Sequence, residues 1–401
     1  MLLALGAAFG VGVYIGVSGG AGTSAAAQQV INIPVGTTNS PADIDMSQFW
    51  EAWNTLESSF VETHASGTIP SDQQKIYGAI SGLVNSYGDP YTVFFPPKEA
   101  TVFNEDVNGS FGGVGMQMDA NAKGQILVTS PLKDSPAAAA GILSGDVITS
   151  IDGTSTAQMS LDEAVQIIRG PVGTTVKLGI LHPGATKEVL ISIVRQTINI
   201  PIIDTKNENG VFTIALYSFS ANSGDLLRGA LRQYFESGDT KLILDLRGDP
   251  GGYLDQAVSI ASYFLPVGDT IVTEDTKGHG QNTVHRSLGY NVFAGKKLSM
   301  AILVDQGSAS ASEILAGALQ QHGVAKLVGT RTFGKGSVQQ LVDLGGGAEL
   351  KVTIARWLTP NGTSISDGGL TPDINATTTA ADVGKGLDPT KSAALAWLAT
   401  Q

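Results

Sequence analysis

A serine-rich segment between an apolar run and a helical pattern is the first part of this sequence that offers a nucleophile. The apolar run Met300–Val304 is followed by Gly307-Ser-Ala-Ser-Ala-Ser-Glu313, with Ser310 at its centre. A serine at a helix N-terminus lies near unpaired backbone N–H groups and the positive end of the helix dipole, which favour a developing negative charge. Ser310-x-x-Glu313 is also a capping box, and a capping serine needs no catalysis. This segment alone therefore leaves a catalytic and a structural role open.

The second chemical feature is a lysine between glycines, in Phe333-Gly-Lys-Gly336. To act as a base near pH 7, Lys335 must be neutral, which requires its pKa to fall by about three units from ~10.4, or about 4 kcal/mol. Burial away from water can produce such a shift. Gln339, four residues later, carries an amide that can hold the amine in place. The structural alternative is a surface lysine in a flexible loop.

A third feature is the turn Asp245-Leu-Arg-Gly-Asp-Pro-Gly-Gly252, which joins a predicted strand to a predicted helix. Its paired glycines, Gly251 and Gly252, let the backbone approach another group closely. Backbone N–H groups at such a turn can form an oxyanion hole, in which one donor is typically worth about 10²–10³ in rate. An ordinary turn is the alternative.

Two other catalytic readings of the sequence are disfavoured. Gly329–Lys335 matches the GxxxxGK pattern of a phosphate-binding loop, but Gly336 stands where a Ser or Thr must bind Mg²⁺, and a strand pattern follows instead of a helix. The histidines have no recognisable catalytic setting, and there is neither a GxSxG elbow nor an HExxH motif. The five histidines are His64, His182, His279, His285 and His322.

The composition narrows the chemistry further. The net charge of −12 disfavours nucleic acid as a partner, because a phosphate-binding surface needs a basic patch. The absence of cysteine excludes disulfides, thiolate nucleophiles and cysteine-ligated metals. The sequence indicates no metal and no cofactor.

The elements that must position these residues follow from the pattern of apolar residues. Helices are predicted at 46–59 and 71–87, where aromatic side chains at helical spacing are expected to be packing residues. Short strands alternate with glycine turns from Phe111 to about Thr197, interrupted by a short helix that begins at a capping box of Ser160 and Glu163. From Gly210 onward, predicted strands at 211–218, 241–245, 300–304 and 325–329 alternate with predicted helices at 223–236, 253–264 and 312–321, which indicates an α/β core. A hairpin is predicted across Gly345–Gly347. The predicted organisation is a helical region at 44–106, a mostly β domain at 107–198, the α/β core at 199–375 and a polar, weakly patterned C-terminal tail at 376–401.

The N-terminus is apolar, with no charged side chain before Asp43. Residues 1–27 are interpreted as a short membrane anchor or a signal segment, and 28–43 as a linker. A buried core helix is the alternative. The interpretation places the protein outside the cytoplasm, in the periplasm or at the cell surface, with its N-terminal segment in the membrane.

Taken in order, these motifs resemble the carboxyl-terminal processing peptidases, which are serine–lysine proteases. The resemblance runs from about Phe49 to Ile374. It is carried by the Ser310 segment, the Lys335 loop with Gln339, and Leu244-Asp-Leu-Arg247 with Pro250-Gly-Gly252. Further matching segments are Gly88-Asp-Pro-Tyr91, Lys351-Val-Thr-Ile-Ala-Arg-Trp357 and Thr371-Pro-Asp-Ile374.

The resemblance implies a role for each site residue. Ser310 corresponds to the nucleophile, Lys335 to the base and Gln339 to the residue that positions the base. The oxyanion donors correspond to the N–H of Ala311 and that of Gly251 or Gly252. The family often has Asn where this chain has Gly248 and Asp249, so this turn carries an additional acid.

The resemblance also implies a ClpP/crotonase-like protease core with an inserted PDZ domain, in an α/β (α+β) multidomain chain. PDZ domains bind a peptide C-terminus as an added strand, and backbone amides of a glycine-rich loop bind its carboxylate. Val165, Ile167 and Ile168, on the helix that Ser160 begins, are expected to line the peptide groove. Arg169, at the end of this helix, is a candidate for sensing the bound terminus or an ordinary charge at a helix end. The implied partners are proteins or peptides with apolar free C-termini, and a homodimer is a further expectation. The alternative function is that of a non-catalytic PDZ scaffold that binds protein C-termini. The predicted carboxylate-binding loop is Gly112-Gly113-Val114-Gly115-Met116.

Overall fold

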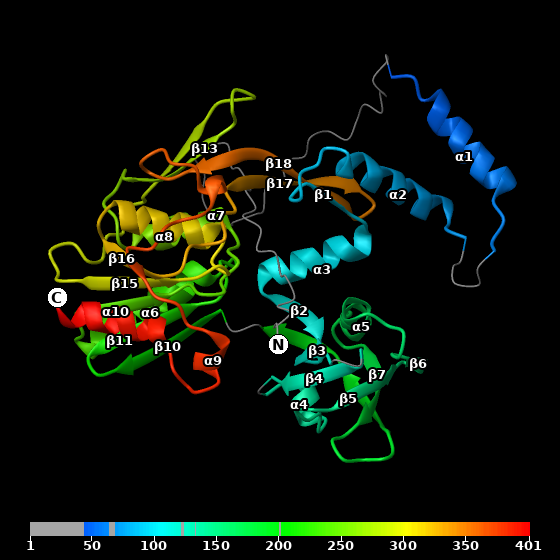
Figure 1. The fold of residues 1–401 in the computed structure, drawn as a ribbon, viewed down its shortest axis with the longest axis horizontal. Coiled ribbons are helices and arrows are strands. Elements are labelled where there is room, and N and C mark those ends of the chain that lie inside the picture. The colour runs from blue at the N-terminus through cyan, green and yellow to red at the C-terminus, as the bar shows by residue number, and fades with distance from the viewer. Residues whose placement is uncertain (1–43, 64–68, 122–123, 133, 200–201) are drawn as a thin grey trace. The chain divides into compact units, whose positions relative to one another are not determined.

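A computed structural model of the chain describes residues 44–401, apart from 64–68, 122–123, 133 and 200–201 (Figure 1). The predicted membrane or signal segment at 1–27 and the linker at 28–43 lie outside the described residues. Among the described residues, no helix combines the length and apolar character needed to cross a bilayer. The chain divides into two compact units. In its described part, the first unit comprises Thr101–Gly336 and Arg356–Gln401, and the second comprises residues up to Ala100 together with Ser337–Ala355.

The core of the first unit is a six-stranded sheet that confirms the predicted α/β alternation. Its order is β10-β11-β12-β15-β16-β19, with β10 antiparallel to β11 and all other neighbours parallel. The strands are β10 (Ile203–Glu208), β11 (Val211–Leu216), β12 (Lys241–Asp245), β15 (Ser299–Val304), β16 (Ala325–Gly329) and β19 (Ile374–Asn375).

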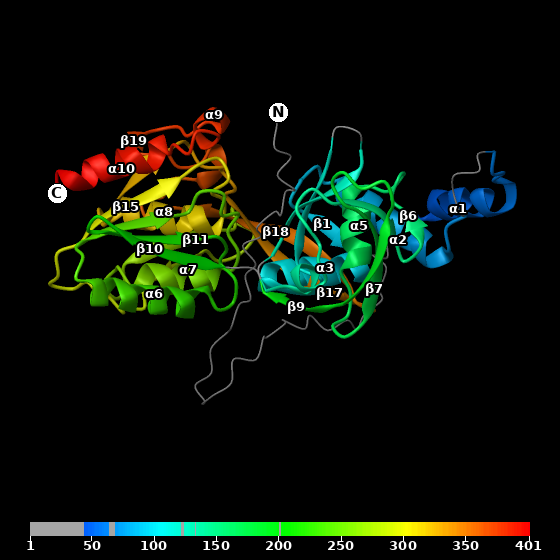
Figure 2. The same ribbon diagram turned by 90° about the horizontal axis from the view of Figure 1, so that it is seen from below.

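Helices cover both faces of this sheet. Helices α6 (Ser223–Ser237) and α7 (Leu254–Ser262) lie on one face, and α10 (Pro389–Ala399) lies on the other (Figure 2). All six residues of β15 are buried, as expected for a central parallel strand covered on both sides. Helix α8 (Ala311–Gln321) follows β15 and has a buried residue at every position from Ala311 to Leu319.

The C-terminal end differs from the predicted polar tail. It contains α9 (Ala380–Val383) and α10, and Ala394 and Leu398 of α10 are fully buried against the strands of the core sheet. The Thr/Ala-rich composition concealed this helix, because two small or medium apolar residues one turn apart are enough to dock it.

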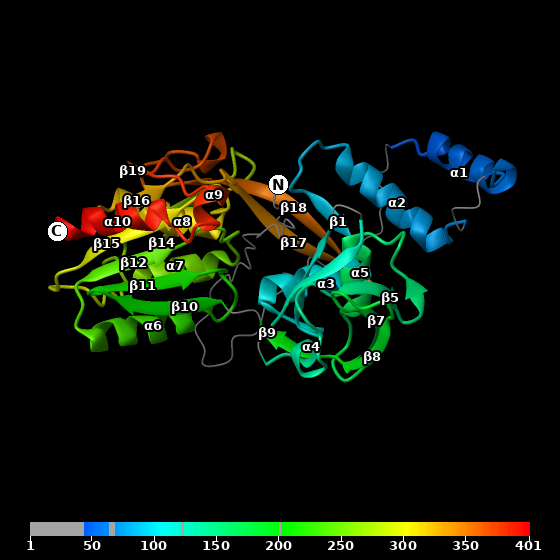
Figure 3. The ribbon, with the colours of Figure 1, turned by 60° about the horizontal axis from the view of Figure 1, so that its bottom comes forward.

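The second sheet of the first unit confirms the predicted mostly β domain (Figure 3). Its antiparallel strands follow the order β3-β4-β5-β7-β8, with β6 beside β5, and β2 separately pairs with β9. Helices α4 (Pro136–Ala139) and α5 (Leu161–Ile168) accompany it, and α5 begins with the predicted capping box of Ser160 and Glu163. The strands are β2 (Ser110–Gly113), β3 (Met116–Ala120), β4 (Ile126–Pro131), β5 (Val147–Ile151), β6 (Thr154–Ser155), β7 (Thr175–Leu181), β8 (Val189–Val194) and β9 (Gln196–Asn199).

The predicted hairpin across Gly345–Gly347 is present as β17 (Ser337–Gly345) and β18 (Ala348–Leu358). In the second unit, β1 (Val93–Phe95) pairs with the first part of β18, and α2 (Asp72–Asn85) packs on β1. In the first unit, the end of β18 pairs with β13. The remaining elements are α3 (Pro97–Asn108), β13 (Thr270–Asp275), β14 (Thr283–Arg286) and the short 3₁₀ helix at Ile365–Asp367.

Helix α1 (Ser47–Ser59) forms where the periodicity predicts it, but its aromatic side chains are not core residues. No residue of α1 is buried. Phe49, Trp50 and Trp53 contact one another, with ring centroids 5.1 to 6.2 Å apart. The apolar spacing therefore predicted the helix correctly. Its aromatic side chains pack on one another, but none is buried among the described residues.

Candidate active site

The predicted catalytic segments follow three neighbouring parallel strands. Gly251 and Gly252 come after β12, Ser310 after β15, and Lys335 after β16. Because the carboxyl ends of parallel strands meet at one edge of the sheet, this is where such folds build their sites. The topology thus explains how three segments far apart in sequence contribute to one site.

Ser310 is held in a backbone conformation that few residues adopt. Its φ is 55° and its ψ is −114°, immediately before α8, and the residue is fully buried. Its Oγ makes no hydrogen bond with any described residue, so the hydroxyl does not cap the helix. A non-glycine residue with positive φ is strained and is typically found at functional sites. The capping alternative for Ser310 is therefore not supported.

The buried carboxylate of Glu313 connects the serine to the lysine loop. Its Oε2 accepts the backbone N–H of Ser310 at 2.9 Å and that of Lys335 at 3.0 Å. Its Oε1 accepts the hydroxyl of Thr332 at 2.5 Å and the N–H of Gly334 at 2.8 Å. Burial raises the pKa of Glu313, and these hydrogen bonds offset part of that effect. One side chain thus fixes the backbone of both predicted catalytic residues.

Sequence reasoning assigned Glu313 only to a capping box and missed this connection. Half of the capping box is real, since Glu313 accepts the N–H of Ser310. The contacts to the lysine loop join residues about twenty positions apart, which no local pattern reveals. The signal that the sequence did offer was a single acid, Glu313, among the small and apolar residues of the predicted helix.

Lys335 is buried, as a catalytic base requires. The residue is only 2% exposed, in the loop between β16 and β17. Burial of this kind disfavours the charged ammonium form of a lysine. Both flanking glycines are needed: a Cβ at Gly336 would lie 2.2 Å from the backbone nitrogen of Ser366, and one at Gly334 (φ 88°) would lie 2.8 Å from that of Gly369. The alternative of a flexible surface lysine is therefore wrong.

The two oxyanion candidates are distinguished by their hydrogen bonds. The N–H of Gly251 donates to Oδ1 of Asp249 at 2.8 Å. The N–H groups of Gly252 and Ala311 have no acceptor among the described residues. The turn lies directly against Ser310, since a Cβ at Gly251 would be 3.0 Å from the Cβ of Ser310 and 2.9 Å from the nitrogen of Ala311. Gly252 and Ala311 are thus the donors available to an oxyanion.

Gln339 belongs to the second unit, where a hydrogen-bond chain orients its amide. Its Nε2 donates to the hydroxyl of Ser337 at 2.7 Å and to that of Thr353 at 3.3 Å. The Thr353 hydroxyl in turn donates to Asp89 at 2.6 Å. The Oε1 of Gln339 is buried and has no partner among the described residues, so it remains an acceptor. Asp89 belongs to the Gly88–Tyr91 motif, whose contribution the sequence did not reveal.

The predicted carboxylate-binding loop lies at the start of the second sheet of the first unit. Gly112 and Gly113 are in β2 and pair with β9, while Val114 and Gly115 connect β2 to β3, which begins at Met116. The N–H groups of Val114 and Gly115 have no acceptor among the described residues. Two consecutive free donors are what a terminal carboxylate would require.

The helix beside this loop is only partly as predicted. Val165 and Ile167 are partly exposed, but Ile168 is 4% exposed and belongs to the core of this domain, so it does not line a groove. Arg169 donates to Asp106 at 2.7 Å, and its guanidinium carbon lies 4.1 Å from the centroid of the Phe111 ring. Arg169 is therefore engaged within its own domain, and a sensing role remains a prediction.

Three of the four described histidines have side-chain partners away from Ser310. His285 bonds to Glu274, and His182 bonds to Asp146 at 2.7 Å. His322 bonds to the carbonyl oxygen of Thr270 at 2.8 Å. Since the Ser310 hydroxyl has no partner among the described residues, none of these histidines forms a catalytic pair with it.

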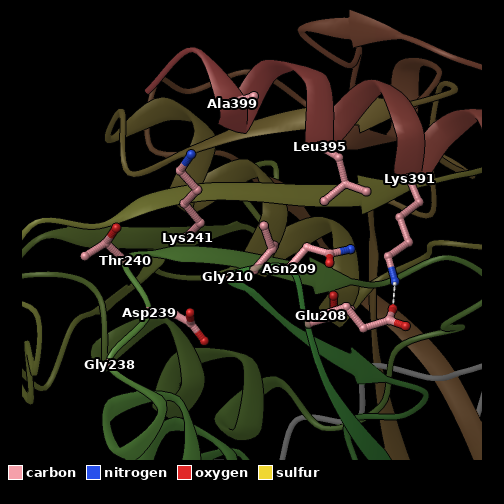
Figure 4. Close-up of a pocket in the computed structure, with 12 residues that line it drawn as sticks. Glu208, Asn209, Gly210, Gly238, Asp239, Thr240, Lys241, Lys391, Leu395 and Ala399 are labelled. Carbon is pink, nitrogen blue, oxygen red and sulfur yellow. Dashed lines mark ion pairs between the residues drawn. The ribbon is translucent and has the colours of Figure 1, made fainter.

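A surface hollow of about 540 Å³ lies elsewhere on the core (Figure 4). It is lined by the β10–β11 turn, the start of β12 and helix α10, and Lys391 reaches Glu208 across it at 3.5 Å. Lys241 begins β12, so this hollow is at the edge of the sheet opposite the catalytic segments. It is not part of the candidate active site.

The chain matches two family models. Residues 210–376 match peptidase family S41, and residues 104–181 match the PDZ domain. A carboxy-terminal-processing protease of Bartonella bacilliformis is 37% identical over 344 residues, which cover 84% of this chain and 77% of that protein. A probable CtpA-like serine protease of Staphylococcus haemolyticus is 38% identical over 322 residues, which cover 80% of this chain and 63% of the length of that relative.

A solved structure agrees with these relatives. The photosystem II D1 C-terminal processing protease superposes with a TM-score of 0.50 at 26% identity, covering 82% of this chain and 92% of that one. The α/β core with a PDZ domain and the site at its strand ends define a peptidase class. The chain belongs to peptidase family S41, the family of the carboxy-terminal-processing proteases. The predicted family and fold class are thereby confirmed.

Proposed function

We propose that this protein is a serine endopeptidase in which Ser310 is the nucleophile and Lys335 the general base. The observation that carries the proposal is the buried Glu313 carboxylate, which binds the backbone of both residues beside an unpartnered serine hydroxyl. Such an arrangement fixes a nucleophile and a base without histidine or metal.

The reaction is acyl transfer through a covalent intermediate. The Oγ of Ser310 attacks the carbonyl carbon of the peptide bond, and its proton passes to the neutral amine of Lys335. The N–H groups of Ala311 and Gly252 stabilise the oxyanion. Lys335 then donates the proton to the leaving amine, and it takes a proton from the water that releases the acyl group from Ser310. Gln339 remains the residue proposed to position the base, and its buried Oε1 is an acceptor without a partner among the described residues.

The substrates we propose are exported proteins cleaved near apolar free C-termini, with the tail bound by the PDZ domain. The two free donors at Val114 and Gly115 support carboxylate binding in that domain. The uncharged N-terminal sequence before Asp43 supports an extracytoplasmic location and a membrane-associated N-terminus.

Hydrolysis of a peptide with an apolar free C-terminus by wild type, Ser310→Ala and Lys335→Ala tests the dyad. Both variants are expected to lose about 10³-fold or more in kcat while keeping their melting temperatures within a few degrees. His322→Ala is the matched control for a histidine-dependent hydrolase and is expected to retain activity.

Labelling with a serine-reactive phosphonate and mapping of the modified residue gives an independent readout. Modification at Ser310 in wild type, and its loss in Lys335→Ala, are expected. A folded wild type that binds free C-termini but neither cleaves peptides nor reacts with the phosphonate would instead be a non-catalytic PDZ scaffold.

A further inference from the structure

Asp249 is a fully buried acid in the turn that carries the two glycines of the oxyanion site. Its Oδ1 accepts the N–H of Gly251 at 2.8 Å. Its backbone carbonyl oxygen accepts the N–H of Ala309 at 3.0 Å and the hydroxyl of Ser312 at 2.9 Å. Asp249 therefore connects the glycine turn to the segment on both sides of Ser310.

The second carboxyl oxygen of Asp249 has no partner. Oδ2 is buried and makes no hydrogen bond with any described residue. Arg247, the nearest basic residue in sequence, is held by Asp245 and by both carboxyl oxygens of Asp388. A buried carboxylate without a cation is far more costly than a buried neutral acid, since charge in a low dielectric needs a compensating partner.

Among the described residues, no cation is paired with the carboxyl group of Asp249. Burial raises the pKa of Asp249 well above its usual range, and the hydrogen bond from the Gly251 N–H to Oδ1 offsets only part of this effect. No charged neighbour contributes to the shift. The titratable groups on the adjoining segments are Asp245 and Arg247 before the turn, Tyr253 and Asp255 after it, Asp305 after β15, Glu313 on α8 and Lys335 after β16.

We propose that Asp249 is a neutral carboxylic acid in the working enzyme and acts as a positioning residue for the oxyanion site. By holding the N–H of Gly251, it leaves the next N–H, that of Gly252, for the oxyanion. A protonated aspartic acid has nearly the shape of an asparagine and can accept the Gly251 N–H through its carbonyl oxygen, so this role needs no charge. This inference rests on the proposed peptidase function for its catalytic part only.

Thermal unfolding of the full chain tests the protonation state without reference to activity. A group that is protonated when folded and ionised when unfolded lowers stability as pH rises from its unfolded pKa to its folded pKa. The melting temperature of Asp249→Asn minus that of wild type is therefore expected to increase steadily from pH 5 upward. A difference that is constant or decreases with pH would overturn the proposal.

Peptide hydrolysis tests the positioning role. Asp249→Ala is expected to reduce kcat at pH 7 about tenfold or more with KM within about twofold, since the acceptor for Gly251 is lost. Asp249→Asn is expected to restore most of the kcat that Asp249→Ala loses. If kcat of wild type declines at alkaline pH because Asp249 ionises, this decline is expected to be absent in Asp249→Asn. Equal activity of the two variants, or an equal collapse of both, would overturn the positioning role.

The thermal unfolding and peptide hydrolysis experiments test this inference and the proposed function separately. If wild type hydrolyses no peptide, the peptidase proposal fails, and the melting temperatures still decide whether Asp249 is neutral. If Asp249→Ala does not fold, the wild type and Asp249→Asn profiles against pH remain decisive.

Discussion

At the residue scale, the two buried acids of the site, Glu313 and Asp249, have different roles. Glu313 accepts four hydrogen bonds through its two oxygens, whereas Asp249 uses only one of its carboxyl oxygens. Charge is useful in the first case, because hydrogen bonds to an ionised acceptor are roughly twice as strong as neutral ones. The number of donors around each group thus separates a carboxylate that organises the site from an acid better left neutral.

Replacing Glu313 with Gln is expected to impair both folding and catalysis. The amide has a single acceptor oxygen, so donors from Ser310, Thr332, Gly334 and Lys335 cannot all be satisfied. Losing two charge-assisted bonds is expected to cost about 3 kcal/mol or more of unfolding free energy. Urea denaturation measures this loss, and kcat should fall with it. The matched control is Glu236→Gln on the exposed face of α6, and equal stability of the two variants would contradict the prediction.

The sequence indicated the proposed nucleophile and base more readily than the residues that hold them in place. Ser310 and Lys335 lie in short glycine- and serine-rich motifs whose unusual composition indicates a special role. Glu313 acts through contacts across about twenty residues, and the choice of Gly252 over Gly251 depends on a hydrogen bond to Asp249. Such long-range and backbone details follow from the folded geometry and cannot be read from spacing.

At the scale of single elements, strand β18 contributes a residue that orients Gln339 on β17. Thr353→Val removes the hydroxyl that accepts from Gln339 and donates to Asp89. One lost hydrogen bond is worth about 1 kcal/mol, so kcat is expected to fall about fivefold with little change in KM. Steady-state kinetics beside Thr353→Ser, which keeps the hydroxyl, measures the effect. Equal kcat values for the two variants would show that this chain does not orient Gln339.

The same strand carries a lysine whose titration should be visible in stability. Burial lowers the pKa of Lys351 from 10.5 to about 8, and Asp89 opposes the shift. Between pH 8 and 10.5 the unfolded chain then binds more protons than the folded one, so stability rises with pH in this window. The melting temperature of wild type minus that of Lys351→Met is therefore expected to increase across it. Lys187→Met, at an exposed position, is the control and should show no such increase.

Elements with a strong apolar period were predictable, and those stabilised only by their neighbours were not. Strands β12, β15 and β16 and helices α6 to α8 were predicted within a few residues, since each is followed by a clear turn or cap. Helix α10 was missed because its docking depends on two buried residues, Ala394 and Leu398. Strands β13 and β14 were missed because burial does not alternate along them: β13 buries Ile271, Val272 and Glu274, and β14 has no buried residue.

At the scale of the whole molecule, the chain joins a PDZ domain to a peptidase core. If the PDZ domain holds the substrate tail, amidating the substrate C-terminus is expected to raise KM about tenfold or more while kcat changes little. The physical reason is the loss of the negative charge that the free N–H groups of its loop would bind. Hydrolysis of matched free and amidated peptides measures the ratio, and equal KM values would exclude tethering through the carboxylate.

The backbone at Ser310 implies that this protein gives up stability in order to keep the serine that we propose as its nucleophile. A side chain at φ 55° and ψ −114° costs about 1–3 kcal/mol, which glycine would largely avoid. Ser310→Gly should therefore melt at a higher temperature than Ser310→Ala, although both lack the hydroxyl. The more heat-resistant form of the molecule would be the one that no longer has a nucleophile, so selection for thermal tolerance alone would act against the active site.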